Sequence, residues 1–220
     1  PLKESHRHFS HLMAIHPLGL VDARGGEADA RTVAASLAEL DRLGPDWWCG
    51  YSYSWLGNMA ARAGDGDRAA AALRTFADCF CLPNSFHANG DQTKSGKSKM
   101  TYRPFTLEGN FAFAAGVQEM LLQSHGGTAR VFPAVPAGWR DVSFDSLRAE
   151  GAFLVSAVRK DGAVAEVRVV SEKGGRLRLE NPFAGGVFKA TGAAASSVRS
   201  AGPAIEAEMR PGDVLRLAAR

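Results

Sequence analysis

The hydrophobic pattern changes from a helical to a strand period between residues 130 and 150, and this change constrains the fold more than any other feature of the chain. In residues 31–43, RTVAASLAELDRL, apolar residues stand at 33, 37, 40 and 43, the spacing of one helix face. In residues 164–170, VAEVRVV, apolar and polar residues alternate, as they do in half-buried strands. The sequence therefore predicts an α part followed by a β part in a multidomain chain.

The α part is divided by glycine-rich and polar breaks. Gly64-Asp65-Gly66-Asp67 separates two predicted helices and indicates an antiparallel αα-hairpin, in which Asp67 could cap the second helix. The polar stretch that runs to about Pro104 predicts a long loop. The helices themselves are expected over residues 31–43, 48–63, 68–80 and 110–124.

Composition excludes several classes of protein. Lys and Arg number 26 against 23 Asp and Glu, a net charge of +3 that does not call for a nucleic-acid partner. The longest apolar runs, such as residues 112–117, fall far short of the ~20 residues of a membrane helix, so we expect no membrane insertion. Three cysteines in a chain of 220 residues do not describe a disulfide framework.

Four of the six histidines lie in the first sixteen residues, around the segment HRHFSH. On a strand His6 and His8 would share a face, as in many metal hydrolases, whereas on a helix His8 and His11 would do so. Arg7 beside these rings also suits the binding of hydroxyls or anions, because both side chains donate directional hydrogen bonds. A surface cluster of hydrogen-bonded polar side chains is the third interpretation.

Glu108 precedes Gly109-Asn110 at the expected start of a helix. The positive end of a helix favours an ionised carboxylate, which suits a base or an electrostatic stabiliser better than a proton donor. The simpler interpretation is a helix capped by Asn110, with Glu108 as a solvated loop residue.

Five aromatic residues fall within nine positions, and two interpretations fit them. Such a cluster most often packs a core, but ring faces and polar tips can also form a platform for sugars. These residues are Trp47, Trp48, Tyr51, Tyr53 and Trp55.

Taken together, these segments resemble glycoside hydrolase family 95, the inverting α-L-fucosidase family. HRHFSHL is similar to the family's HRHxSHL block, TLEGNFAFAAGVQEMLLQSH to its DGNFG…EMLLQSH segment, and FPAVPAGW to its LPALPxW connector. The stretch GYSYSWLGNMAARAGDGDRA resembles the family's hairpin, and residues 150–183 resemble its following β region.

The resemblance implies an (α/α)6 barrel followed by a β-sandwich. Residues 1–130 would be the C-terminal part of the barrel, 131–147 a connector and 148–220 the all-β sandwich-like C-terminal domain. Such a barrel has twelve helices and the sequence shows about five, so we expect about half of the barrel here and a missing N-terminal part of the same protein. The family also implies a secreted or periplasmic location.

The implied activity is inverting, exo-acting hydrolysis of terminal α-L-fucosides, or of related α-L-galactosides, in an oligosaccharide or glycoconjugate, with neither cofactor nor metal. Glu108 matches the family's catalytic aspartate, whereas the general acid would lie upstream, which predicts an inactive isolated chain. Arg7 and His8 would contact sugar hydroxyls, and Tyr51 stands where the family has Trp. The remaining candidate substrate-binding residues are His6, His11 and Asn110.

Departures from the family pattern indicate a divergent branch. Glu replaces Asp at 108, Ala112 replaces a glycine, and the segment between Asn84 and Phe105 is longer than the family's. Two alternatives stand beside the glycosidase: a non-catalytic carbohydrate-binding relative, and a metal-dependent hydrolase using His6, His8 and His11.

Overall fold

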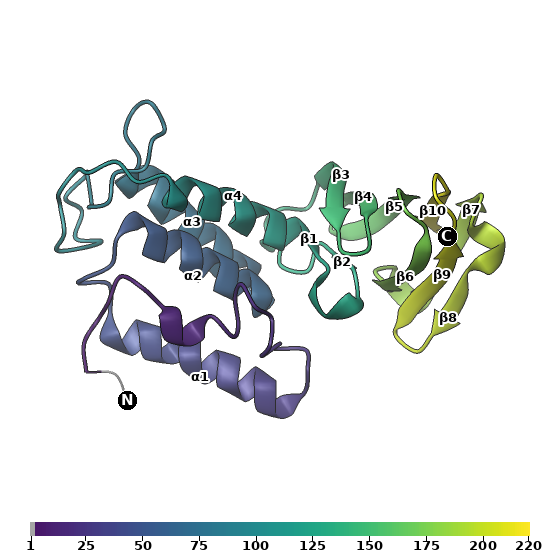
Figure 1. Ribbon diagram of the computed structural model, residues 1–220, viewed down its shortest axis with the longest axis horizontal. Helices are drawn as coiled ribbons and strands as arrows, with labels where there is room; N and C mark the ends of the chain where they lie inside the picture. The colour runs from purple at the N-terminus through teal and green to yellow at the C-terminus, as the bar shows by residue number, and fades with distance from the viewer. Residues whose placement is uncertain (1–2) are drawn as a thin grey trace. The chain divides into compact units, whose positions relative to one another are not determined.

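The computed structural model describes residues 3–220, which form two compact units (Figure 1). The first unit comprises the chain up to Met120 together with Ala134–Pro136, and the second comprises Leu121–Pro133 and Ala137–Arg220. All α-helices of the described residues begin in the first unit, and all strands lie in the second. The α-then-β order predicted from the sequence is confirmed.

The described residues contain four α-helices, against the expected five or so: α1 (Glu27–Leu43), α2 (Gly50–Arg62), α3 (Gly66–Phe80) and α4 (Glu108–Leu121). The predicted hairpin of α2 and α3 is confirmed, but its cap is Asp65, not Asp67. The Asp65 carboxylate accepts a hydrogen bond from the Arg68 N–H at 3.0 Å. Helix α4 begins at Glu108, two residues before the predicted start, so Asn110 lies inside it.

The helices pack because each presents apolar residues to a shared core. Helix α1 buries Val33, Leu37 and Leu40, three of the four positions that its spacing predicted. The N-terminal segment joins this core through Phe9, whose ring meets that of Trp48 edge-on at 5.2 Å. The histidine-rich segment is therefore anchored, although it is neither a strand nor an α-helix; only Ser10–Leu12 form a short 3-10 helix, η1.

The predicted long loop between α3 and α4 has a fixed internal structure organised by Asp91. This fully buried carboxylate accepts hydrogen bonds from both the N–H and the hydroxyl of Thr93, and from the N–H of Lys97, at 2.8–3.0 Å. Burial by itself raises the pKa of Asp91, but these bonds lower it below its usual value. The loop is tied to α2 by Tyr53, whose hydroxyl donates to the Lys97 carbonyl at 2.7 Å.

The second unit consists of antiparallel sheets. One has five strands in the order β3-β4-β5-β10-β7, another has three in the order β6-β9-β8, and β1 pairs with β2. The strands are β1 (Leu122–Gln123), β2 (Arg130–Val131), β3 (Val142–Ala149), β4 (Phe153–Lys160), β5 (Ala163–Ser171), β6 (Gly175–Glu180), β7 (Phe188–Gly192), β8 (Arg199–Ala201), β9 (Ala204–Met209) and β10 (Val214–Ala219).

Alternate residues of β4, β5 and β10, the central strands of the five-stranded sheet, are buried, so this sheet has one apolar face. Val167 and Val169 of β5 are fully buried, as are Leu215 and Leu217 of β10. Strand β3 lies mostly within residues 131–147, which the sequence suggested as a connector. Its alternation is hidden because the register with β4 shifts between Phe144 and Leu147.

One charged residue is buried within the three-stranded sheet. Glu206 of β9 is 2% exposed and accepts hydrogen bonds from three arginines, Arg176 at 2.5 Å, Arg178 at 2.6 Å and Arg199 at 3.1 Å. These bonds, that of Arg176 foremost, lower the pKa of Glu206 to about 2, although burial acts in the opposite direction.

Candidate functional site

Glu108 stands at the first position of α4, beside an open cavity of about 350 Å³ in the first unit. The positions 108, 111, 112 and 115 share one helix face, and all four of their residues line the cavity. Helix α2 and the segment before α1 supply the rest of the wall. The complete lining is His16, Pro17, Tyr51, Trp55, Asn58, Glu108, Phe111, Ala112 and Ala115.

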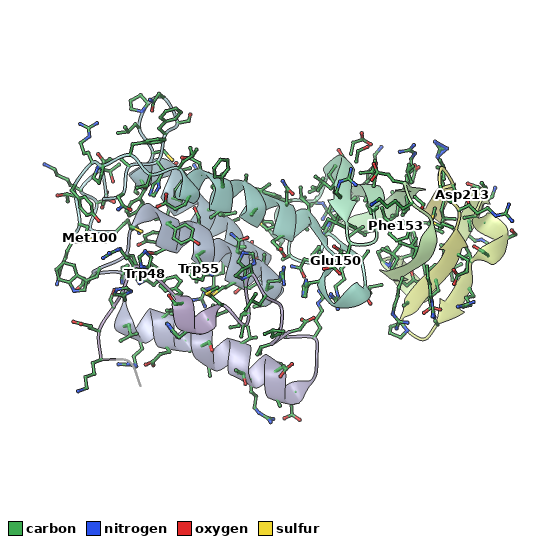
Figure 2. The ribbon with its side chains drawn as sticks, viewed as in Figure 1. Trp48, Trp55, Met100, Glu150, Phe153 and Asp213 are labelled. Atoms are coloured by element: carbon green, nitrogen blue, oxygen red, sulfur yellow. The ribbon has the colours of Figure 1, made fainter. Side chains whose placement is uncertain are left out.

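The aromatic wall of the cavity comes from α2. Tyr51 and Trp55 are one turn apart, with ring centres 5.4 Å from each other. Trp55, labelled in Figure 2, is 7% exposed, and its indole N–H donates to the His16 carbonyl at 3.0 Å. Burial raises the pKa of Tyr51, and the negative charge of Glu108 raises it further. The Tyr51 hydroxyl therefore stays protonated, and Glu108 lies within its electrostatic range.

In the histidine-rich segment, the pKa of His8 responds to the charge of Glu108. Partial burial lowers the pKa of His8, and Arg7 and His6 lower it further, whereas the charge of Glu108 acts in the opposite direction. The segment is held to the first turn of α2 because the Ser52 hydroxyl donates to the Arg7 carbonyl at 2.6 Å. Tyr51 and Glu108 line the cavity itself, whereas the exposed His8 does not line it and is linked to Glu108 by the electrostatic effect on its pKa.

The other candidates of this segment lie apart from the first cavity. Arg7 and His6 line a second cavity of about 250 Å³, together with Trp47 and with Met100 of the long loop, which Figure 2 labels. His6 Nδ1 accepts a hydrogen bond from the His8 N–H at 3.1 Å. His11 is exposed in η1 and lines neither of these two cavities.

Asn110 positions a loop. Its Oδ1 accepts a hydrogen bond from the His87 N–H at 3.0 Å, and its Nδ2 donates to the Ser85 carbonyl at 2.9 Å. Both ends of the amide are therefore engaged in fixing residues 85–87 to the first turn of α4. This arrangement differs from the cap or substrate contact expected from the sequence.

His87 is a residue of the site that sequence reasoning missed. Its ring is fully buried, and Nδ1 lies 2.8 Å from the Thr106 carbonyl. A Cβ on Gly50 would stand 2.3 Å from Nε2 of His87, and one on Gly109 would stand 2.5 Å from Nδ1. The signal in the sequence was a glycine within the first turn of both α2 and α4, which leaves room for this ring.

Burial lowers the pKa of His87, against the opposing effects of the Thr106 carbonyl and Glu108. The neutral imidazole donates a hydrogen bond from its Nδ1–H to the Thr106 carbonyl. The ring packs between the N-terminal ends of α2 and α4. It therefore sets the spacing of Tyr51 on α2 and Glu108 on α4.

The described part of the chain offers no ligand set to a metal. Among residues 3–220, no three His, Cys, Asp or Glu side chains come close enough together to hold an ion. His6, His8 and His11 thus do not form the site that the metal-hydrolase alternative requires. Within the same residues, no helix combines the length and the apolar character needed to cross a membrane.

Comparison with known families identifies both parts of the chain. Residues 2–121 match the model of the glycosyl hydrolase family 95 catalytic domain, and residues 123–217 match that of the glycoside hydrolase family 95 C-terminal domain. These two matches place the chain in the class of glycoside hydrolase sequences. Within this class, the chain belongs to glycoside hydrolase family 95.

A curated relative agrees with this assignment. The chain is 30% identical over 170 residues to alpha-L-fucosidase 2 of Arabidopsis thaliana, an alignment that covers 76% of this chain and 19% of that protein. The chain therefore spans about a fifth of the length of this relative.

Proposed function

We propose that the protein carrying this chain is an inverting, exo-acting glycosidase that hydrolyses terminal α-L-fucosides or the related α-L-galactosides. The observation that carries the proposal is the place of Glu108, at the N-terminal end of α4 in a cavity walled by Tyr51 and Trp55. Aromatic faces and a carboxylate in one open cavity suit a sugar ring. The printed name of the Arabidopsis relative supports the sugar.

In this mechanism Glu108 is the general base. Its carboxylate, at the N-terminal end of α4, takes a proton from the water that attacks the anomeric carbon. Tyr51 remains a hydrogen-bond donor beside it. Burial is the main cause that lowers the pKa of His8, so its imidazole is mostly neutral at pH 7. A neutral imidazole can donate a hydrogen bond to a sugar hydroxyl or accept one from it.

Inversion needs a second carboxyl group ~6.5–9.5 Å away, which protonates the leaving group. In the described part of the chain, Glu108 is the one carboxylate that lines this cavity. We therefore propose that the general acid comes from the N-terminal part of the same protein, and that α1–α4 form part of an (α/α)6 barrel with it. The 220 residues alone should cleave no glycoside.

The test is kinetic and uses the full-length protein with 4-nitrophenyl α-L-fucoside and α-L-galactoside. Glu108→Gln should lower kcat by at least a hundredfold, since the base is lost while the shape is kept. Glu108→Asp restores the family's residue and should retain activity. Glu150→Gln, an exposed carboxylate of the second unit, is the control and should leave kcat unchanged.

Two further readouts complete the test. NMR of the first product should show the β-anomer, as inversion requires, and a chelator should leave the rate unchanged. A Glu108→Gln enzyme with unaltered kcat on every cleaved glycoside would exclude the proposed role of this residue.

The second candidate is a carbohydrate-binding relative without turnover. The glutamate at 108, one methylene longer than the family's aspartate, favours it, since a displacement of ~1 Å at a reacting group can cost ~100-fold in rate. Sugar binding by the full-length protein without hydrolysis would identify this alternative.

A further inference from the structure

The lining of the cavity beside Glu108 includes the buried amide of Asn58, whose oxygen has no hydrogen-bond partner among the described residues. Asn58 of α2 is fully buried and lines this cavity. Its Nδ2 donates to the carbonyls of Ser54 and Ala112, both at 2.8 Å. Its Oδ1 is buried and has no hydrogen-bond partner among the described residues.

The orientation of this amide is fixed by chemistry. Both partners of one end are backbone carbonyls, which accept only, so that end must be the NH2 group. The other end is then the carbonyl oxygen. A buried oxygen without a partner is destabilising, and a native structure seldom leaves one uncompensated.

The place of Asn58 relates it to Glu108. Ala112, whose carbonyl Asn58 binds, stands one helical turn after Glu108 on the same face of α4, ~6 Å along the axis. Asn58 therefore lies one turn away from the carboxylate along the helix, in the wall of the cavity that Trp55 also lines.

We infer that Asn58 is a substrate-binding residue whose Oδ1 accepts a hydrogen bond from a hydroxyl of the sugar ring held beside Glu108. The inference rests on the proposed function for its ligand class and deepens it, because it names the group that selects for a hydroxyl at the inner end of the site. A site built around a buried acceptor rejects an analogue that lacks the donor, since the acceptor is then left unpaired.

The experiment measures the affinity of the full-length protein for L-galactose and for its monodeoxy forms at positions 2, 3, 4 and 6, the last being L-fucose. In the wild-type protein, one deoxy form should bind about tenfold more weakly than L-galactose. Asn58→Ala should bind L-galactose about tenfold more weakly and should no longer discriminate against that deoxy form.

Two more variants separate binding from packing. Asn58→Ser keeps a hydroxyl that can donate to the Ser54 carbonyl four residues back, so it preserves part of the helix contact and should also lose the discrimination. Ser54→Ala is the matched control: it removes the 3.0 Å bond from α2 to the Gly109 carbonyl without touching the cavity wall. It should keep the full discrimination.

The opposite outcomes overturn the inference. Equal losses for all five sugars in both Asn58 variants would mean that Oδ1 binds only an internal water, such as one shared with the unpartnered Nη1 of Arg62. Equal affinities of the wild-type protein for all five sugars, or no binding of any, would overturn it too. Selective binding without hydrolysis would refute the glycosidase while supporting the role of Asn58.

Discussion

The imidazole of His87 occupies the space that a side chain at Gly50 would need, with 2.3 Å between its Nε2 and the position of a Cβ. The Cβ of Phe80 would also lie within 2.7 Å. A side chain at the start of α2 would therefore force the ring or the helix end to move, and the buried ring packs against the ends of both α2 and α4. Two predictions follow from this contact.

Gly50→Ala should lower the free energy of unfolding by about 1–3 kcal/mol, because the added methyl group forces the ring of His87 or the helix end to move. Urea unfolding of the chain checks this. Gly138→Ala is the matched control, since nothing lies within 4 Å of a Cβ there; it should change stability by less than about 0.5 kcal/mol. Equal changes in the free energy of unfolding for the two substitutions would show that the His87 ring moves aside without destabilising the chain.

Stability should fall as the pH drops below about 6.5, the ordinary value for histidine. Burial lowers the pKa of His87 in the folded chain, so the unfolded chain binds a proton at a pH where the folded chain does not. The stabilisation due to neutral His87 is fully present above pH 6.5. Below that pH the free energy of unfolding falls by up to about 1.4 kcal/mol per pH unit, until His87 is protonated in the folded chain as well. His8 acts in the same direction, because burial lowers its pKa also.

Unfolding at pH 7.5 and 5.5 measures this loss, and His87→Gln should reduce it. An NMR titration of the His87 ring in the wild-type chain gives the same answer without a variant. A midpoint at or above 6.5 would contradict the burial argument.

The sequence allowed the order of the two units and a helix start close to Glu108 to be predicted, because both depend on local pattern. The period of residues 31–43 and the glycine breaks around the α2–α3 hairpin are properties of neighbouring residues. A helix was likewise expected from Asn110, directly after Glu108, and α4 begins two residues earlier, at Glu108 itself.

What could not be predicted depends on contacts between distant residues. His87 is defined by Gly50 and Gly109, and Asn110 by Ser85 and His87, none of which a local pattern reveals. The histidines at 6, 8 and 11 suggested one cluster, and the rings of His6 and His8 do meet edge-on at 5.5 Å, whereas His11 lies in η1. Strand β3 was missed because a register shift interrupts its alternation.

Asp91→Asn should loosen the long loop between α3 and α4. The carboxylate accepts hydrogen bonds from Thr93, Ser95 and Lys97. In the Asn variant the side-chain NH2 group would face some of these donors, of which the N–H groups cannot accept a hydrogen bond from it. Hydrogen exchange of the Thr93 and Lys97 amides should speed up by about tenfold or more. Asp78→Asn, in the exposed ion pair with Arg74, is the control and should leave these amides unchanged. Unaltered protection in Asp91→Asn would show that Tyr53 and the other contacts hold the loop without it.

The ion pair of Arg62 and Glu119 should contribute far more to stability than that of Arg74 and Asp78. In the first pair the guanidinium and carboxylate meet through two bonds, at 2.6 and 2.8 Å, and the side chains are 10% and 17% exposed. In the second pair they are 82% and 61% exposed and 3.3 Å apart. Removing one partner of a largely buried pair leaves the other charge without compensation, whereas an exposed charge is solvated by water.

Glu119→Gln should therefore cost about 2–4 kcal/mol in the free energy of unfolding, and Asp78→Asn less than about 0.5 kcal/mol. Urea titrations at low and high salt give both values. The cost in Glu119→Gln should change little with salt, because a buried pair is poorly screened. If the two substitutions cost the same, or if salt abolishes the difference, the Arg62–Glu119 pair does not join α2 to α4 in the way that its geometry indicates.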